Sequence, residues 1–201
     1  MSPTASPIED FLVAIDQAWT GGPGPKIRLR VLGSAALMLQ ADYVRGTKDS
    51  DVLETADLTP EIKTQLLALA GKETALATTH HMYLDIVPRG LPFLPMVPAW
   101  HPLAALSQKL THFEVEVLGV VDTVTSKLKR FSANDQADIK AMVERDLVEH
   151  SVLVERFVSA VDRFSGDARA EDLPLYVAHL HRIEREVFIV PESAIELPDW
   201  I

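Results

Sequence analysis

The chain contains no cysteine. This absence excludes disulfide bonds, thiolate metal sites and cysteine nucleophiles together, and it is typical of cytosolic proteins. No apolar run approaches the roughly 20 residues that a membrane-spanning helix needs. Residues 1–10 also lack the basic segment and hydrophobic run of a secretory signal. We therefore expect a soluble, cytoplasmic protein that does not enter a membrane.

Positive charge is scarce. Lysine and arginine total 19 against 29 acidic residues, which gives a formal net charge of −10. An acidic surface repels nucleic acid at long range, so broad non-specific DNA binding is not expected. An anionic substrate would instead bind through a local concentration of positive charge, helped by a metal ion.

Several sequence motifs of common enzymes are missing. There is no Gly-x-Gly-x-x-Gly and no Gly-Lys-Ser/Thr loop, so Rossmann and P-loop folds lack support. There is no Gly-x-Ser-x-Gly elbow of a serine hydrolase. Adjacent histidines such as His80 and His81 point to opposite faces of a strand, and His179 and His181 diverge on a helix. A histidine zinc site is therefore not expected.

Apolar and polar residues alternate in several short stretches, the pattern of strands with one buried face. The predicted strands are 27–31, 49–53, 81–87 and 113–117. Residues 91–102 contain four prolines, so no regular element is expected there.

Capping residues and helical periodicity mark the helices. Ser6 and Pro7 open a first helix, and residues 35–40 favour a second. Thr59 and Pro60 open a third, which Gly71 ends. From Asp122 onward, apolar residues recur at three- and four-residue spacings. A break at 166–167 precedes a last helix over 173–187. The order is mixed α/β first and all helix afterwards.

A glycine turn and two acids carry the first chemical signal. Gly33-Ser34 lies between a predicted strand and a predicted helix, where backbone amides and the helix start favour a phosphate. Asp49 and Asp51 are two apart on a strand and so share a face. Two such carboxylates suit a hard divalent ion, which would activate a hydroxyl and neutralise a leaving pyrophosphate. Alternatively, the acids are a solvated surface feature or cap a turn.

Asp85 is a third acid, inside the strand-like run 81–87. A carboxylate there is costly unless it is paired or binds a cation. The alternative is an edge strand on which Asp85 meets solvent or an arginine.

The stretch Val31-Leu-Gly33-Ser34 followed by Thr47-Lys-Asp49-Ser-Asp51-Val resembles the signature of the DNA polymerase beta-like nucleotidyltransferase superfamily. In that superfamily a hydrophobic residue and Gly-Ser or Gly-Gly precede Asp-x-Asp or Asp-x-Glu, and a third acid lies on a later strand. The resemblance implies an α/β (α+β) fold with a small mixed sheet and flanking helices. It covers residues 27–145.

The resemblance also implies roles for these residues. Asp49 and Asp51 would hold Mg²⁺ or Mn²⁺, and Asp85 would assist as a ligand or general base. Gly33 and Ser34 would contact the triphosphate of an NTP. Residues 1–120 would form the nucleotidyltransferase-like core, and residues 121–201 a helical region packed on it.

The downstream helices look more like the bacterial toxin–antitoxin and abortive-infection branch. That branch carries a lysine-containing helix followed by an Asp-x-x-Asp helix, and here Lys127 precedes Asp135 and Asp138. The likeness implies that Lys127 and Arg130, which share a helix face, bring positive charge to the phosphates. A solvated basic face is the alternative.

Further roles are predicted for residues close to these two motifs. Arg45 and Thr47 lead the motif in the same branch and would belong to the nucleotide site. Asp135 and Asp138 would orient Lys127, or merely favour the start of their helix, which Ser132 would cap.

This chain departs from the superfamily pattern at three points. Fourteen residues separate Ser34 from Asp49, Ser50 stands where an apolar residue is usual, and Asn134 replaces an arginine. The expected activity is transfer of a nucleoside monophosphate from an NTP to a hydroxyl of tRNA or a protein, within a toxin–antitoxin pair that includes an antitoxin partner. The alternatives are an interaction module with weakened catalysis and a structural protein whose acidic motif is coincidental.

Overall fold

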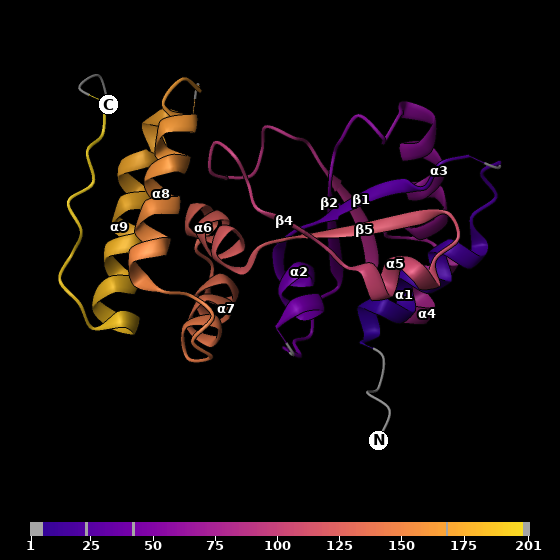
Figure 1. The fold of residues 1–201 in the computed structure, drawn as a ribbon, viewed down its shortest axis with the longest axis horizontal. Coiled ribbons are helices and arrows are strands. Elements are labelled where there is room, and N and C mark those ends of the chain that lie inside the picture. Colours follow the sequence, from indigo (N-terminus) through magenta and orange to yellow (C-terminus); the bar gives the residue numbers. More distant parts are fainter. Residues whose placement is uncertain (1–5, 23, 42, 168, 199–201) are drawn as a thin grey trace. The chain divides into compact units, whose positions relative to one another are not determined.

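The structure is a computed structural model that describes residues 6–22, 24–41, 43–167 and 169–198. The chain divides into two compact units (Figure 1). The first comprises Met1–Leu91 and Trp100–Leu118, and the second comprises Pro92–Ala99 and Gly119–Ile201. The proline-rich segment 92–99 thus belongs to the second unit, although its neighbours on both sides belong to the first.

The first unit contains, in its described residues, a five-stranded mixed sheet of order β3-β2-β1-β5-β4. β1 is parallel to β5 and β2 is parallel to β3, whereas β1–β2 and β4–β5 are antiparallel. The predicted α/β class with a small mixed sheet is confirmed. The strands are β1 (Ile27–Val31), β2 (Asp49–Leu53), β3 (Tyr83–Val87), β4 (Trp100–Pro102) and β5 (Phe113–Leu118).

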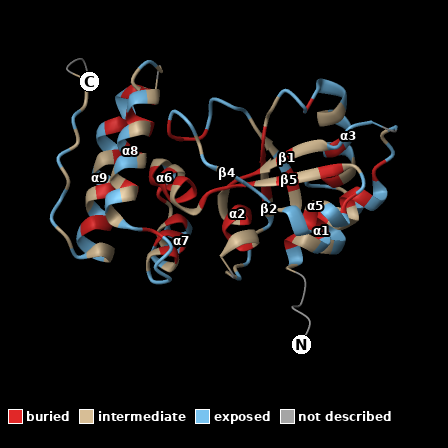
Figure 2. Ribbon diagram, viewed as in Figure 1, coloured by how far each residue is buried: buried red, intermediate tan, exposed pale blue. Residues whose placement is uncertain are grey.

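Each central strand has one apolar and one polar face, because successive side chains point to opposite sides. Figure 2 shows this alternation of buried and half-buried positions along β1 and β5. The apolar face packs against the helices of the first unit, and each fully buried Leu, Val or Phe contributes roughly 1.5–3 kcal/mol. These helices are α1 (Pro7–Ala18), α2 (Gly33–Gln40), α3 (Pro60–Ala70), α4 (Ala75–His80) and α5 (Ala104–Lys109).

The predicted helix signals lie where the helices begin and end. Ser6 is the N-cap of α1 and Pro7 is its first residue. The Thr59 side chain accepts a hydrogen bond from the Ile62 amide at 3.3 Å, and Gly71 ends α3. These predictions are confirmed. They could be made from the sequence because a helix cap is formed by residues close in sequence.

Two predicted boundaries are wrong. The strand predicted from residue 81 begins at Tyr83, because His81 adopts a left-handed conformation (φ 53°) and ends α4. The segment predicted to be irregular, 91–102, ends in strand β4. β4 is a short strand at the edge of the sheet, where a residue such as Pro102 is tolerated without a donor.

The second unit is helical, as predicted. Helix α6 lies against three other helices of the unit, and Phe93 from segment 92–99 packs its ring edge-on against Phe157, Phe164 and Tyr176 at 5.1–5.4 Å. In the part of the chain that is described, no helix has both the length and the apolar character needed to cross a bilayer. The helices are α6 (Val120–Arg130), α7 (Ala133–Val143), α8 (His150–Phe164), η1 (Ala170–Asp172), α9 (Leu173–Ile183) and η2 (Glu184–Phe188).

Candidate functional site

Gly33 forms the turn between β1 and α2 with a φ of +68°, in the left-handed region. A Cβ atom at this position would lie 2.9 Å from Oδ2 of Asp51. Both the backbone conformation and the space therefore require glycine. The Leu32 amide also donates to the Asp51 carbonyl at 3.0 Å, which extends the β1–β2 pairing up to the turn. The turn and the acid predicted to act together are in direct contact.

The start of α2 is suited to an anion. Its first amides have no intrahelical acceptor, and the N-cap residue, Leu32, has no polar side chain to satisfy them. The Arg45 guanidinium donates from Nη1 to the Ser34 hydroxyl at 3.0 Å. A helix N-terminus, a hydroxyl and a guanidinium thus meet beside Gly33, and this combination favours a phosphate group.

The three predicted acids share the polar face of the sheet. Asp49 and Asp51 alternate with the buried Ser50 on β2, and Asp85 on β3 is in register with Asp51. Residues in register on parallel strands project to the same side. Asp49 and Asp51 are half-buried, whereas Asp85 is exposed on a strand at the edge of the sheet, which was the alternative considered for it.

Burial and the negative charge of these carboxylates both affect the pKa of Tyr83 on β3. Burial raises the pKa of its phenol, and the negative charges of the three acids raise it further. Nevertheless, within the described ranges no three His, Cys, Asp or Glu side chains are close enough to hold a metal ion together. Two carboxylates and substrate oxygens are a sufficient shell for Mg²⁺, so Asp49 and Asp51 fit this ion. The three-acid ligand set stays a prediction.

Thr47 holds one of the acids in place. Its hydroxyl donates to the Asp49 carboxylate at 2.7 Å and lies 3.2 Å from the Asp49 carbonyl. The sequence predicted that Thr47 belongs to the nucleotide site. The structure gives it a contact to a predicted metal ligand.

The family described as "Nucleotidyltransferase of unknown function" (DUF6036) matches residues 12–185, which is most of the chain. The chain belongs to this nucleotidyltransferase family. No curated protein and no solved structure matches it.

In the helical unit, Lys127 is buried between two acids. Its Nζ lies 3.1 Å from Oδ1 of Asp135 and 2.8 Å from Oδ2 of Asp138. The three side chains are 5%, 1% and 0% exposed. Charges so far from water must be paired, and here they pair with one another. Of the two roles considered for these acids, charge pairing with Lys127 is observed.

Asp135 also stabilises the start of its own helix, which was the second role considered for it. Asp135 and Ser132 form a reciprocal capping box at the start of α7, so the predicted cap is confirmed. Burial alone would raise the pKa of the Asp135 carboxyl, but hydrogen bonds from Arg130 and Ser132 and the charge of Lys127 hold that pKa well below its ordinary value. Arg130 donates to Asp135 at 2.8 Å, yet its own side chain is 72% exposed.

Sequence reasoning missed part of the polar face of the sheet. Arg28 and Arg30 on β1 bind Glu114 and Glu116 on β5, each through an Nε–carboxylate bond of 2.8 Å. The guanidinium of Arg30 also lies 5.1 Å from the centre of the Trp100 ring on β4. The signal was present, since arginines alternate along 27–31 as glutamates alternate along 113–117, but only the pairing of the strands brings them together.

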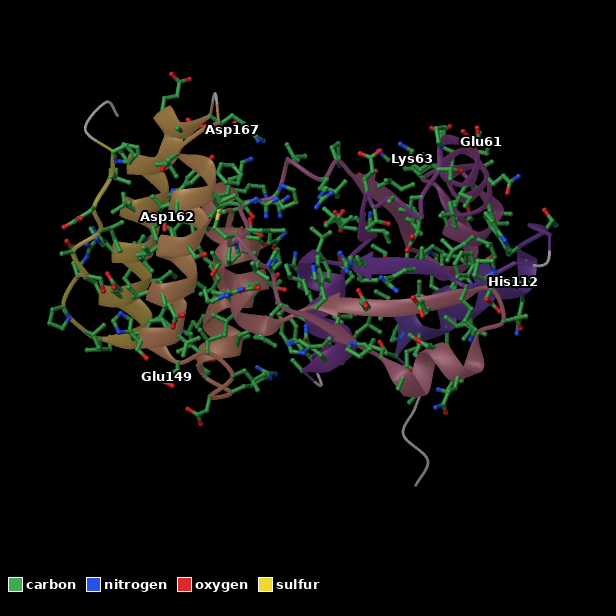
Figure 3. The ribbon with its side chains drawn as sticks, turned by 45° about the horizontal axis from the view of Figure 1, so that its top comes forward. Glu61, Lys63, His112, Glu149, Asp162 and Asp167 are labelled. Carbon is green, nitrogen blue, oxygen red and sulfur yellow. The ribbon has the colours of Figure 1, made fainter. Side chains whose placement is uncertain are left out.

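A cavity of about 410 Å³ lies elsewhere in the nucleotidyltransferase core. Its lining includes Ile86, from the apolar face of the sheet, and the ion pair of Glu54 with Lys63. Figure 3 shows Lys63 on α3. None of the predicted site residues lines this cavity, so the candidate site is the polar face of the sheet beside Gly33.

Proposed function

We propose that this nucleotidyltransferase transfers a nucleoside monophosphate from an NTP to a hydroxyl group of an RNA, such as tRNA, or of a protein. The observation that carries the proposal is the contact between the Gly33 turn and the Asp51 carboxylate. The start of a helix thus lies beside a carboxylate, which supports binding of a phosphate and a divalent cation at neighbouring positions. The family supports the class of reaction, and the geometry around Gly33 supports the choice of residues.

The triphosphate binds at the start of α2. Its oxygens accept from the first amides of the helix and from Ser34 and Arg45, which already lie 3.0 Å apart. This local positive charge is needed because the whole chain carries a net charge of −10.

Asp49 and Asp51 hold Mg²⁺ or Mn²⁺, together with phosphate oxygens of the substrate. When bound, the ion neutralises charge on the leaving pyrophosphate and lowers the pKa of the attacking hydroxyl. Thr47 keeps the Asp49 carboxylate turned toward this position through its 2.7 Å hydrogen bond.

Asp85 acts as the general base. The acceptor oxygen forms a bond to the α-phosphorus, the bond from that phosphorus to the pyrophosphate oxygen breaks, and the hydroxyl proton passes to the Asp85 carboxylate. Its place in register with Asp51 and its exposure to water support this role, because the proton must then leave to solvent.

The two cationic residues of α6 that the resemblance singles out, Lys127 and Arg130, differ in role. Lys127 is enclosed by buried carboxylates and stabilises the helical unit. Arg130 binds Asp135 but is 72% exposed, and its contact with a substrate phosphate rests on the likeness of the motifs alone. The placement in a cytoplasmic toxin–antitoxin pair, with an antitoxin as protein partner, rests on the likeness of the motifs around Arg45 and Lys127.

A second candidate is an interaction module that binds nucleotides without transferring them. It is favoured by the finding that, among the described residues, no three acids are gathered to hold a metal. In this case the phosphate site at α2 persists but no acceptor is modified.

The experiment is incubation of the protein with α-phosphate-labelled NTPs, Mg²⁺ and total RNA or protein extract. We expect one acceptor to be labelled, and Asp49→Asn or Asp51→Asn to abolish the labelling. Asp162→Asn, an exposed change of the same kind on α8 (Figure 3), serves as the control and should label as the wild type does. Labelling that survives in both site variants would exclude Asp49 and Asp51 as the residues of the activity, and a wild type that neither labels an acceptor nor binds NTP would exclude the activity itself. NTP binding without labelling would support the second candidate.

A further inference from the structure

Trp100 lies in surroundings unlike those of a structural tryptophan. Trp19, for comparison, is 8% exposed and packs edge-on against Phe113 at 5.2 Å in the core. Trp100 is only half-buried and lies on a strand at the edge of the sheet. It pairs with Leu118 on β5, two residues beyond Glu116, so its ring projects from the same polar face as the predicted acids.

Arg30 connects this ring to the acid site. Arg30 pairs with Leu53 on β2, so Asp51 is its diagonal neighbour on the same face. Diagonal neighbours on antiparallel strands have centres about 7–8 Å apart. In the other direction the Arg30 guanidinium lies 5.1 Å from the centre of the Trp100 ring. Arg30 therefore lies between a predicted metal ligand on the neighbouring strand and the aromatic ring that its side chain reaches.

The Arg30 side chain is also held in place. Its Nε donates to Glu116 at 2.8 Å, and the ring supports its planar head. A guanidinium held on an indole ring forms a flat surface that is ordered before a ligand binds. Binding a ligand on this surface therefore costs little additional side-chain entropy.

The charges of this face match the two parts of a nucleotide. Arg28 and Arg30 are balanced by Glu114 and Glu116, so this half of the face carries no net charge. The phosphate-binding turn and the acids lie in the other half. A neutral, flat base suits the Arg30–Trp100 surface, whereas a phosphate does not, because Glu116 already takes up the charge of Arg30.

We propose that Arg30 and Trp100 form a nucleobase platform beside the acid site, on which the base of the bound nucleotide stacks. This inference rests on the proposed function for the position of the phosphates. The base belongs either to the donor NTP or to the end of an RNA acceptor, and both present the same aromatic surface.

The test compares ligands with and without a base. Calorimetry with full-length protein and Mg²⁺ measures the Kd of each NTP, of inorganic triphosphate and of a short single-stranded RNA. We expect Trp100→Leu and Arg30→Gln to weaken NTP binding on the order of tenfold, the size of one lost stacking contact. Binding of inorganic triphosphate should not change. Trp100→Phe should restore most of the affinity.

Arg28→Gln is the matched control, since Arg28 lies on the same strand and binds a glutamate in the same way without contacting the ring. It should bind NTP as the wild type does. If the loss in Trp100→Leu falls on the RNA and not on the NTP, the platform holds the base of the acceptor, and the proposal stands in that form.

Three results would overturn the platform. Equal losses for NTP and inorganic triphosphate would mean that Trp100 only supports the fold of the acid site. If Trp100→Leu binds NTP and RNA as tightly as the wild type, the platform is wrong while the proposed function stands. If the wild type binds none of the three ligands, both proposals fail.

Discussion

The Asp51 carboxylate occupies the space that a side chain at position 33 would need. Its Oδ2 would stand 2.9 Å from a Cβ atom on Gly33, and the φ of Gly33 is +68°. The glycine therefore does more than permit a turn. It allows the backbone that opens α2 and the acid on β2 to approach each other, and several consequences of this and of other contacts can be measured.

Gly33→Ala should lower the free energy of unfolding by about 1–2 kcal/mol, the cost of a left-handed residue with a Cβ atom. It should also displace the Asp51 carboxylate and weaken binding of Mg²⁺ with NTP. Urea unfolding and calorimetry test the two effects. Gly90→Ala is the control, because among the described residues, its two chain neighbours aside, no atom lies within 4 Å of its Cβ position. Unchanged nucleotide affinity in Gly33→Ala would contradict a shared site.

Thr47→Val should weaken Mg²⁺–NTP binding about fivefold, because Asp49 loses the hydrogen bond that orients it, a loss of about 1 kcal/mol. Thr47→Ser keeps the hydroxyl and should bind as the wild type does. The exposed Thr78→Val, on α4, controls for the change of shape. If Thr47→Ser binds as weakly as Thr47→Val, the hydroxyl is not the cause.

Lys127→Met should destabilise the helical unit by about 3–5 kcal/mol, because it removes the cation that lies between two buried carboxylates. Lys140→Met removes an exposed pair with Glu144 at the end of α7 and should cost less than about 0.5 kcal/mol. Circular dichroism during denaturant unfolding measures both. Similar stabilities of the two variants would show that the buried triad does not stabilise the unit.

Asp135 should make the helical unit acid-sensitive. Its folded pKa lies below the ordinary value of 3.8, so the unfolded chain binds a proton there before the folded chain does. The stabilisation is present above pH 3.8 and is lost as the pH falls toward the folded pKa. Unfolding free energies measured between pH 7 and pH 3 should therefore fall less steeply at the acid end in Asp135→Asn than in the wild type. Equal slopes would contradict the assignment.

Ser50→Ala should raise the free energy of unfolding by up to about 1 kcal/mol. The Ser50 hydroxyl is fully buried and has no hydrogen-bond partner among the described residues, which is costly. Ser107→Ala is a matched contrast, because its hydroxyl accepts from the Val115 amide at 2.9 Å and its loss should destabilise by about 1 kcal/mol. Destabilisation by Ser50→Ala would indicate a partner for that hydroxyl.

Local patterns in the sequence were sufficient for most elements of the fold, although they gave no prediction of α4 and α5 and missed β4. The alternation over 27–31 and the cap at Thr59 act within a few residues of the chain, so each could be predicted without knowing what packs against it. The glycine turn and the Asp49–Asp51 pair were recognisable for the same reason. The strand predicted to begin at His81 failed at its start, because a left-handed residue that ends a helix leaves no periodic signal.

Only the tertiary structure decided which distant residues meet. Strand order and register place Asp85 beside Asp51, bring Arg30 to Trp100, and leave segment 92–99 with the helices rather than with the sheet. Register and helix packing depend on how whole faces are buried against each other, and that balance is a property of the folded chain rather than of any short stretch of it. The sequence alone therefore determined which residue types could do the chemistry, and the packing of the sheet determined which of them share a face.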